Sequence, residues 1–243
     1  MITYLLAATL LATSTSAAEQ PKTAVVELFT SEGCSSCPRA DVLLGELTSK
    51  SWSGQVIGLA FHVDYWDRLG WKDRFSDNRF TKRQYRYAEK LPDSRVYTPQ
   101  MVVDGTIGFV GSYRSQAVDA IESTLGEVDD VRVSIQVEEI NGRTAKLAYR
   151  FDPSTEGLLL NAALAERKTS TDVKRGENGG RVLEHSHVVR AFKQFPAGTK
   201  GIGTTKLAIP NDVTPGDLDG VIYIQDRESL AVFGAAKVAL KGE

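Results

Sequence analysis

Residues 25–41 read VVELFTSEGCSSCPRAD, an apolar run that is followed by two cysteines and a proline. The run predicts a buried strand, and the apolar residues of segment 40–47 then recur at helical spacing. Pro38 suits the first turn of that helix, because a backbone N–H at this position would have no partner within the helix. Cys34 and Cys37 are therefore expected at the N-terminus of a helix that follows a strand.

The Cys-Ser-Ser-Cys motif contains both cysteines of the chain. A thiolate is the reactive form of cysteine, and the N-terminus of a helix stabilises its negative charge. Cys34 is expected to be the more exposed, attacking sulfur, and Cys37, deeper in the first turn, would resolve a mixed disulfide. In an oxidising compartment the two sulfurs can close into a disulfide. Ser35 and Ser36, between them, are expected to lie beside a substrate.

The rest of the first half alternates strand and helix patterns. A second apolar run at residues 56–63 predicts a strand parallel to the first. Residues 64–95 are charged and rich in aromatic residues, which indicates an inserted helical segment. The pair Asp104-Gly105 between two short apolar runs predicts a hairpin, and Ser112 is the expected cap of a last helix. This alternation predicts an α/β layer around a mixed sheet.

Beyond residue 129 the sequence changes to seven short β-type runs that are separated by turn signals. Such a series without helical periodicity predicts an all-β sandwich. The expected organisation is therefore a first α/β domain at residues 23–128, with the helical insertion at 64–95, followed by a sandwich domain at 130–243.

The N-terminus has the pattern of a secretory signal peptide. Residues 2–12 are nearly all apolar, and small residues follow, with Ser16 and Ala18 at the spacing of a cleavage site. The apolar run is too short to cross a bilayer as a stable helix. We expect a signal peptide at residues 1–18, a periplasmic or secreted mature chain, and no integral membrane segment in that chain.

The composition of the 243 residues is that of an ordinary soluble protein, with 42% hydrophobic and 25% charged residues. A formal net charge of −2 provides no basic field, which disfavours nucleic acid as a partner. The chain also lacks a glycine-rich phosphate loop, a G-x-S-x-G elbow and an H-E-x-x-H motif. Nucleotide binding, serine hydrolysis and zinc proteolysis therefore lack their usual signatures.

Polar and aromatic residues follow the second predicted strand. His62 and Asp64 alternate and so share a face, at the edge of the sheet where the cysteine turn is also expected. These two residues, together with Tyr65 and Trp66, are expected to line the site. His62 is either a base for a thiol, a metal ligand, or a structural histidine with a hydrogen-bond partner.

Two further histidines, His185 and His187, alternate in the second half of the chain. They have no cysteine or other histidine near them in the sequence. We therefore expect exposed strand residues at these positions rather than metal ligands.

The stretch 25–41 resembles the first strand, active-site turn and first helix of the thioredoxin superfamily, and Thr98-Pro99 resembles its cis-proline. The resemblance implies a thioredoxin-like first domain, a cis Thr98–Pro99 bond, and a substrate groove shaped by Pro99 opposite the cysteines. Gly33 departs from the family pattern, which has an aromatic residue before the first cysteine. Leu28 stands where thioredoxins have a buried acid, and Glu27 would point to the opposite face of the strand.

The chain as a whole resembles a bacterial family of secreted thioredoxin-like proteins of unknown function. Four segments carry this resemblance: FTSEGCSSCPRAD, FHVDYWDRLGWKDRFS, YTPQMVVDG and RGENGGRVLEHSHVVR. They are spread over most of the expected mature chain. The resemblance implies a fold and does not assign a reaction.

The leading functional hypothesis is an exported thiol–disulfide oxidoreductase or disulfide-handling protein. Cys34 would be the nucleophile, Cys37 the resolving thiol and Pro99 part of the groove, with thiols or disulfides of envelope proteins as substrates and no cofactor. One alternative is a copper-handling protein with Cys34, Cys37 and His62 as ligands of Cu(I). The other is a non-catalytic envelope binding module in which the disulfide is structural.

Overall fold

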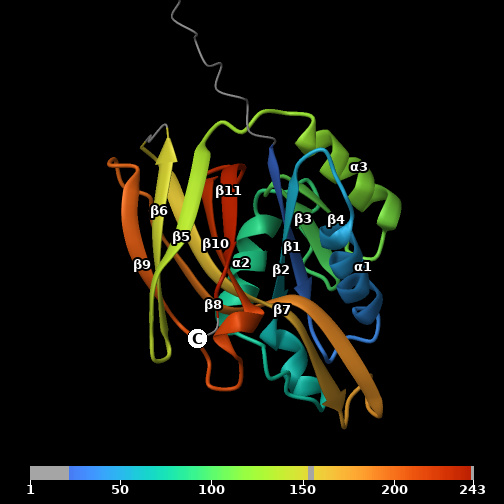
Figure 1. Cartoon of the computed structure of the whole chain (residues 1–243). Helices are drawn as coiled ribbons and strands as arrows, with labels where there is room; N and C mark the ends of the chain where they lie inside the picture. The colour runs from blue at the N-terminus through green and yellow to red at the C-terminus, as the bar shows by residue number, and fades with distance from the viewer. Residues whose placement is uncertain (1–21, 153–155, 242–243) are drawn as a thin grey trace, which may run out of the picture.

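The computed structural model describes residues 22–152 and 156–241, which form two β-sheets and three α-helices (Figure 1). The larger sheet has eight strands in the order β11-β10-β7-β8-β2-β1-β3-β4, and the smaller has the order β5-β6-β9. The expected signal peptide lies outside the described residues. No helix in the described part is long and apolar enough to cross a membrane.

The elements of the first half are β1 (Thr23–Thr30), α1 (Pro38–Ser49), β2 (Gln55–His62), the 3-10 helix η1 (Asp64–Leu69), α2 (Asn78–Ala88), β3 (Gln100–Val103), β4 (Ile107–Val110) and α3 (Arg114–Leu125). The elements of the second half are β5 (Arg132–Asn141), β6 (Thr144–Asp152), β7 (Leu158–Val173), β8 (Arg181–Pro196), β9 (Ile202–Ala208), the 3-10 helix η2 (Pro215–Asp217), β10 (Leu218–Asp226) and β11 (Val232–Ala239).

Several local predictions are confirmed in the first half. β1 pairs with β2 in parallel, and α1 begins at Pro38 with Cys37 as its N-cap. β3 and β4 form the expected hairpin, whose turn residues Asp104 and Gly105 both have positive φ, at 45° and 75°. The predicted cap of α3 is wrong, because Ser112 lies in the turn after β4 and Tyr113 is the N-cap.

The expected fold class, an α/β thioredoxin-like domain followed by a separate all-β sandwich, is wrong. β2 pairs on its second edge with β8, in parallel, at Ala60 and Val188. Strands from both halves therefore belong to one mixed sheet, and the molecule is mostly β. The sequence pattern missed this pairing because β7 and β8 each have 16 residues, whereas their apolar runs mark only about half of each strand.

The larger sheet is covered on both faces. Successive residues of a strand point to opposite faces, so Leu28 packs under α1 and α3 while Phe29 packs under α2. In the same way Ala162 of β7 faces the three-stranded sheet and Ala163 faces the apolar cluster under α2, called the α2 cluster below. Figure 1 shows the helices α1 and α3 at one end of the molecule and β5, β6 and β9 at the other.

The α2 cluster contains residues from both halves of the chain, including Phe29, Phe61 and Tyr87 from the first half and Val189 and Tyr223 from the second. The expected boundary between residues 128 and 130 falls between α3 and β5. The division into two independently folding domains stays a prediction.

A buried ion pair lies inside this apolar cluster. Arg83 of α2 donates to both carboxylate oxygens of Glu27 in β1, from Nε and Nη2, each at 2.6 Å. The hydroxyl of Tyr87 donates to Glu27 at 2.8 Å and that of Tyr223 in β10 at 3.2 Å. Burial opposes the charge of Arg83, but Glu27 outweighs it and holds the pKa of Arg83 well above its usual value. The pair thus joins β1, α2 and β10.

We expect Arg83→Leu to lower the free energy of unfolding by about 3–5 kcal/mol, because it leaves the buried carboxylate of Glu27 without its counter-charge. The matched control is Arg79→Leu, one turn earlier in α2. Arg79 is exposed and pairs with Asp77 at the surface, so its loss should cost about 0–1 kcal/mol. Urea unfolding measures both values, and equal costs would contradict the role of the buried pair.

A second buried carboxylate, that of Asp104, lies in the turn between β3 and β4. Its Oδ1 accepts the N–H of Val25 at 2.8 Å, and its backbone carbonyl accepts the N–H of Val232. Burial raises the pKa of Asp104 to about 7, although the hydrogen bond from Val25 and the ammonium group of Lys22 at 3.6 Å oppose the shift.

We expect Asp104→Asn to remove a pH-dependent part of the stability. The folded-state pKa lies above the value of about 3.9 in an unfolded chain, so protonated Asp104 contributes stability below about pH 4, and this contribution is lost as the pH rises through about 7. Asparagine keeps the acceptor for Val25 and tolerates a positive φ. Urea unfolding from pH 4 to 8 should show the wild type losing stability relative to the variant, and parallel curves would refute the assignment.

Candidate functional site

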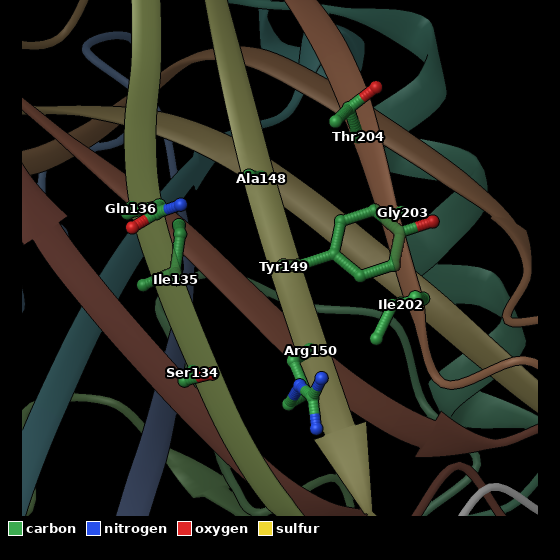
Figure 2. Close-up of a pocket in the computed structure, with 9 residues that line it drawn as sticks. All are labelled: Ser134, Ile135, Gln136, Ala148, Tyr149, Arg150, Ile202, Gly203 and Thr204. Atoms are coloured by element: carbon green, nitrogen blue, oxygen red, sulfur yellow. The ribbon is translucent and has the colours of Figure 1, made fainter.

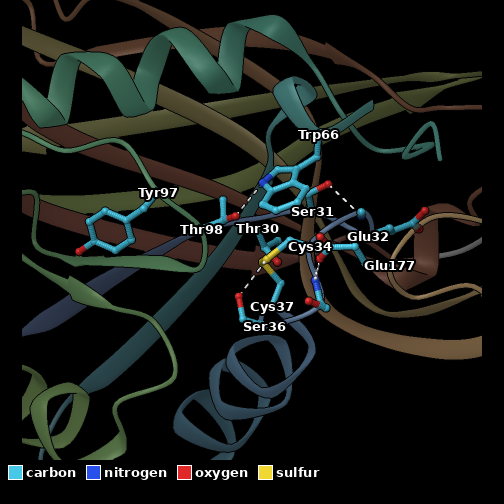
Figure 3. The surroundings of a disulfide bond; sticks show 12 residues. Thr30, Ser31, Glu32, Cys34, Ser36, Cys37, Trp66, Tyr97, Thr98 and Glu177 are labelled. Atoms are coloured by element: carbon cyan, nitrogen blue, oxygen red, sulfur yellow. Dashed lines mark hydrogen bonds between the residues drawn. A yellow bond between two sulfur atoms is a disulfide. The ribbon is translucent and has the colours of Figure 1, made fainter. Parts of the chain in front are cut away.

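Cys34 and Cys37 form a disulfide in the turn between β1 and α1 (Figure 3). Their Cα atoms are 5.4 Å apart, and the N–H of Cys37 donates to the carbonyl of Cys34 at 3.2 Å. Both cysteines are fully buried. The prediction that Cys34 is the more exposed of the two is therefore wrong, whereas Ser35 and Ser36 between them are exposed.

Trp66 of η1 provides the first part of the cover over the disulfide. Its side chain is among those drawn around the disulfide in Figure 3, and its Nε1 donates to Oγ1 of Thr98 at 2.8 Å. A Cβ added at Gly33 would lie 3.1 Å from the Cβ of Trp66, which is tighter than most real contacts. Trp66 thus occupies the space beside residue 33, which explains why glycine stands there in place of an aromatic residue.

The connection between β7 and β8 provides the second part of the cover. The amide of Asn178, which is fully buried, donates to the carbonyls of Glu32 at 2.9 Å and Cys34 at 3.0 Å. The carboxylate of Glu177 accepts the N–H of Ser35 at 3.0 Å, and hydrogen bonds from the side chain and the backbone of Ser35 lower the pKa of Glu177. The second half of the chain therefore closes over the Cys-Ser-Ser-Cys turn. Sequence reasoning gave no role to these residues, although the RGENGG segment contains them.

The predicted Thr98–Pro99 element is present, and its peptide bond is cis, as expected. Thr98 is joined to the site through Trp66. Pro99 borders the space beside Gly111 together with Ala40 of α1, so it lies next to the helix that begins at the motif. Ser36 is the residue in polar contact with a sulfur, with its Oγ 3.3 Å from Sγ of Cys34.

Asp64 and Tyr65 fix η1 to α2. The hydroxyl of Thr81 donates to Asp64 at 2.6 Å, and the hydroxyl of Tyr65 donates to Gln84 at 3.2 Å. Burial raises the pKa of Tyr65 to about 12. Of the aromatic residues expected here, Trp66 lies beside Gly33, directly before Cys34.

His62 lies in a buried polar cluster. Its Nδ1 is 2.6 Å from Oδ2 of Asp73, and neither side chain is exposed. In the described part of the chain, the hydrogen-bond partner of His62 is thus Asp73 rather than either cysteine. The prediction that His185 is exposed is wrong: it is buried, with its ring centroid 5.1 Å from that of His62. Sequence separation hid this pair, because β8 joins β2 only in the folded sheet.

Two carboxylates face the ring of His185. Its Nε2 is 3.7 Å from Glu32 and its Nδ1 is 3.8 Å from Asp41. Burial lowers the pKa of His185, but these carboxylates outweigh burial and raise it to about 9. His187 is different, since it is half-buried and bonded to the hydroxyl of Thr48, and burial lowers its pKa to about 4.

A separate hollow of about 510 Å³ lies across β5, β6 and β9, and Figure 2 draws the residues that line it. The ring of Tyr149 lies against Gly203, where an added Cβ would be 2.5 Å from the hydroxyl oxygen. The lining residues are Ser134, Ile135, Gln136, Ala148, Tyr149, Arg150, Ile202, Gly203 and Thr204. They include no cysteine, histidine or carboxylate, so this hollow has no evident catalytic chemistry.

We expect Asn178→Ala to make the disulfide more accessible to a reductant. The substitution removes two hydrogen bonds that hold the β7–β8 connection on the motif, and at about 1 kcal/mol each their loss should raise the rate of reduction by dithiothreitol roughly 30-fold. Asn141→Ala, at an exposed turn between β5 and β6, is the matched control. Quenched alkylation and mass spectrometry measure the rate, and equal rates in the two variants would contradict the cover.

The chain matches a family model described as a protein of unknown function, DUF1223, over residues 25–225. A structural-genomics crystal structure of a protein from Agrobacterium tumefaciens is similar, with 28% identity, a TM-score of 0.68, and coverage of 91% of this chain and 96% of that one. A domain of the outer membrane lipoprotein Omp28 from Porphyromonas gingivalis is matched with 11% identity over 47% of this chain and 91% of its own, at a TM-score of 0.28. No curated protein sequence matches. Since the family model spans most of the sequence and most of both sheets, the chain belongs to the DUF1223 family of proteins of unknown function.

Proposed function

We propose that the chain is an exported thiol–disulfide exchange protein that acts on thiols or disulfides of envelope proteins. The observation that carries this proposal is the Cys34–Cys37 disulfide at the start of α1, next to the cis Thr98–Pro99 bond. The signal-peptide pattern at residues 1–18 supports export, and an exported chain would have this centre in the periplasm or outside the cell.

The position of the sulfurs suits a leaving thiolate. Cys37 is the N-cap of a 12-residue helix, whose N-terminus stabilises negative charge on a nearby sulfur. Ser36 is placed to donate its hydroxyl hydrogen to a thiolate at Cys34. Two local features therefore favour the charged form of the reduced pair.

The exchange takes place in two steps. A substrate thiolate attacks Sγ of Cys34, the new sulfur–sulfur bond forms, and Cys37 leaves as a thiolate. A second substrate thiol, after losing its proton, attacks the substrate sulfur of the mixed disulfide and releases Cys34. The substrate loses two electrons and two protons, and the cysteine pair gains them. The reverse sequence reduces a substrate disulfide, with Cys34 as attacking thiolate and Cys37 as resolving thiol.

Both steps require the cover to open, because the cysteines are fully buried. Opening the cover would break the bond from Trp66 to Thr98 and the bond from Asn178 to the carbonyl of Cys34. A hollow of about 380 Å³ lies beside the segment that leads into Thr98–Pro99. It is lined by Arg95, Val96, Tyr97 and Val110. It offers a place for an extended substrate segment that approaches the opened site.

Burial of both cysteines also supports a second candidate, an envelope binding module in which the disulfide is structural. Against it, a disulfide that closes so short a loop adds little stability in the chain-entropy model. The copper alternative has less support, because its thiolates are joined in the disulfide and His62 is held by Asp73.

We expect the single-cysteine variants to differ. Cys37→Ser leaves Cys34 free and should accumulate a mixed disulfide with oxidised glutathione, because the resolving thiol is gone. Cys34→Ser should accumulate roughly ten-fold less, since its remaining sulfur lies inside the first turn of α1. Intact-mass spectrometry after acid quenching measures both adducts.

The reduction potential of the wild-type pair separates the two candidates. A value within the range of known exchange proteins, from roughly −120 to −270 mV, supports exchange. A potential below roughly −300 mV, together with equal adduct formation in the two variants, would make the disulfide structural and favour the binding module.

A further inference from the structure

Buried polar atoms without partners gather at one place in this fold. Six buried side-chain nitrogen or oxygen atoms in the described part of the chain have no hydrogen-bond partner, and five belong to four neighbouring side chains. These five are Oε1 of Glu32, Oδ1 of Asp41, Nε2 of His62, and both ring nitrogens of His185. Buried polar atoms in native proteins are nearly always paired, so this concentration points to a shared partner.

Three of these side chains converge from three elements. Asp41 lies in α1, His62 ends β2, and His185 lies in β8. One ligand atom from each lies within 4.8 Å of the others, and the three side chains are at most 2% exposed. The imidazole planes are inclined at 77°, so the two rings do not stack on each other.

Neighbouring groups leave the inward atom of each ligand free. Asp73 binds Nδ1 of His62 at 2.6 Å, which leaves Nε2 available. Nε2 of His185 lies 3.7 Å from Glu32 and Nδ1 lies 3.8 Å from Oδ2 of Asp41, so both ring nitrogens face a carboxylate without a hydrogen bond to it. A carboxylate on the distal nitrogen of a ligating histidine is the usual outer-shell arrangement of metal sites, and His62 has one in Asp73.

We propose that Asp41, His62 and His185 bind one divalent transition-metal ion of the zinc type. Two imidazoles and one carboxylate are a donor set that zinc accepts, whereas calcium and magnesium prefer oxygen ligands throughout. The ion lies among three buried carboxylates, those of Asp41, Glu32 and Asp73, which its double charge compensates. Nε2 of His62, Nδ1 of His185 and Oδ1 of Asp41 are the ligand atoms.

The surrounding residues already hold this geometry. The hydroxyl of Thr30 donates to Oδ2 of Asp41 at 3.2 Å, so Oδ1 is the free oxygen. Nε1 of Trp71 donates to Oε2 of Glu32 at 2.6 Å and fixes the carboxylate that faces His185. An open groove of about 720 Å³ between α1 and β8 borders His185 and offers an entry path.

This site is independent of the proposed exchange reaction, because neither cysteine is a ligand. It is nevertheless close to the disulfide, since the N–H of Asp41 donates to the carbonyl of Cys37 at 3.1 Å. The ion also joins β2 and α1 to β8, whose hairpin carries the cover. The competing state is a metal-free cluster in which a protonated His185 balances Glu32 and Asp41.

The test uses the full mature chain with its disulfide intact, stripped with a chelator and titrated with Zn²⁺ alone. We expect about one ion per chain by calorimetry and by elemental analysis after dialysis. His185→Asn should lose this binding, and Asp73→Asn should weaken it by about 10–100-fold. His187→Asn is the matched control, because it changes the histidine two residues along the same strand and should leave affinity unchanged.

A double Cys34→Ser, Cys37→Ser variant should also retain the ion, which separates this site from one built on cysteine thiolates. If His185→Asn does not fold, metal binding by the wild-type protein decides whether the site exists. Co²⁺ should then give the visible bands of nitrogen and oxygen ligation without a thiolate charge-transfer band, and Zn²⁺ should raise the melting temperature. Failure of the wild type to take up either ion, or equal loss of binding in His187→Asn, would overturn the proposal in favour of the protonated cluster.

Discussion

The contact between Arg83 and Glu27 is the constraint around which the larger sheet is arranged. A carboxylate in the middle of a buried strand is tolerated only if a counter-charge and further donors reach it. Glu27 receives them from α2 and β10, so the first strand of the chain, the helix that covers the sheet and a strand of the second half must meet at one point. The disulfide turn leaves the end of that same strand, and its position depends on this arrangement.

Local elements of the fold could be predicted from the sequence because their signals are local. The strand before Cys34, the helix that begins at Pro38 and the Asp104-Gly105 hairpin each depend on residues within a few positions of one another. The pairing of β2 with β8 joins residues more than a hundred positions apart, and no short-range pattern encodes it. A prediction that lacks the β2–β8 pairing gives each half of the chain a separate sheet. The predicted fold class was wrong for this reason.

The candidate site shows the same limit. The disulfide, the cis bond at Pro99 and the place of Trp66 followed from motif and resemblance, and the structure contains them. The partners of His62 did not follow, because Asp73 is in a loop and His185 arrives on β8. Asn178 was equally invisible, since a buried asparagine in a polar loop resembles any turn residue until the carbonyls that it binds are known.

The two parts of the cover, Trp66 and the connection between β7 and β8, are synthesised at different times. Trp66 follows Cys37 closely in the chain, whereas Asn178 is joined to the motif across a sequence separation of 144 residues. A chain that emerges from its N-terminus therefore presents the Cys-Ser-Ser-Cys turn to oxidants and reductants for as long as β7 and β8 are still missing. Once the hairpin is in place, Asn178 covers the turn, so reagents that meet the chain before β8 forms have freer access to the two sulfurs than those that meet it afterwards.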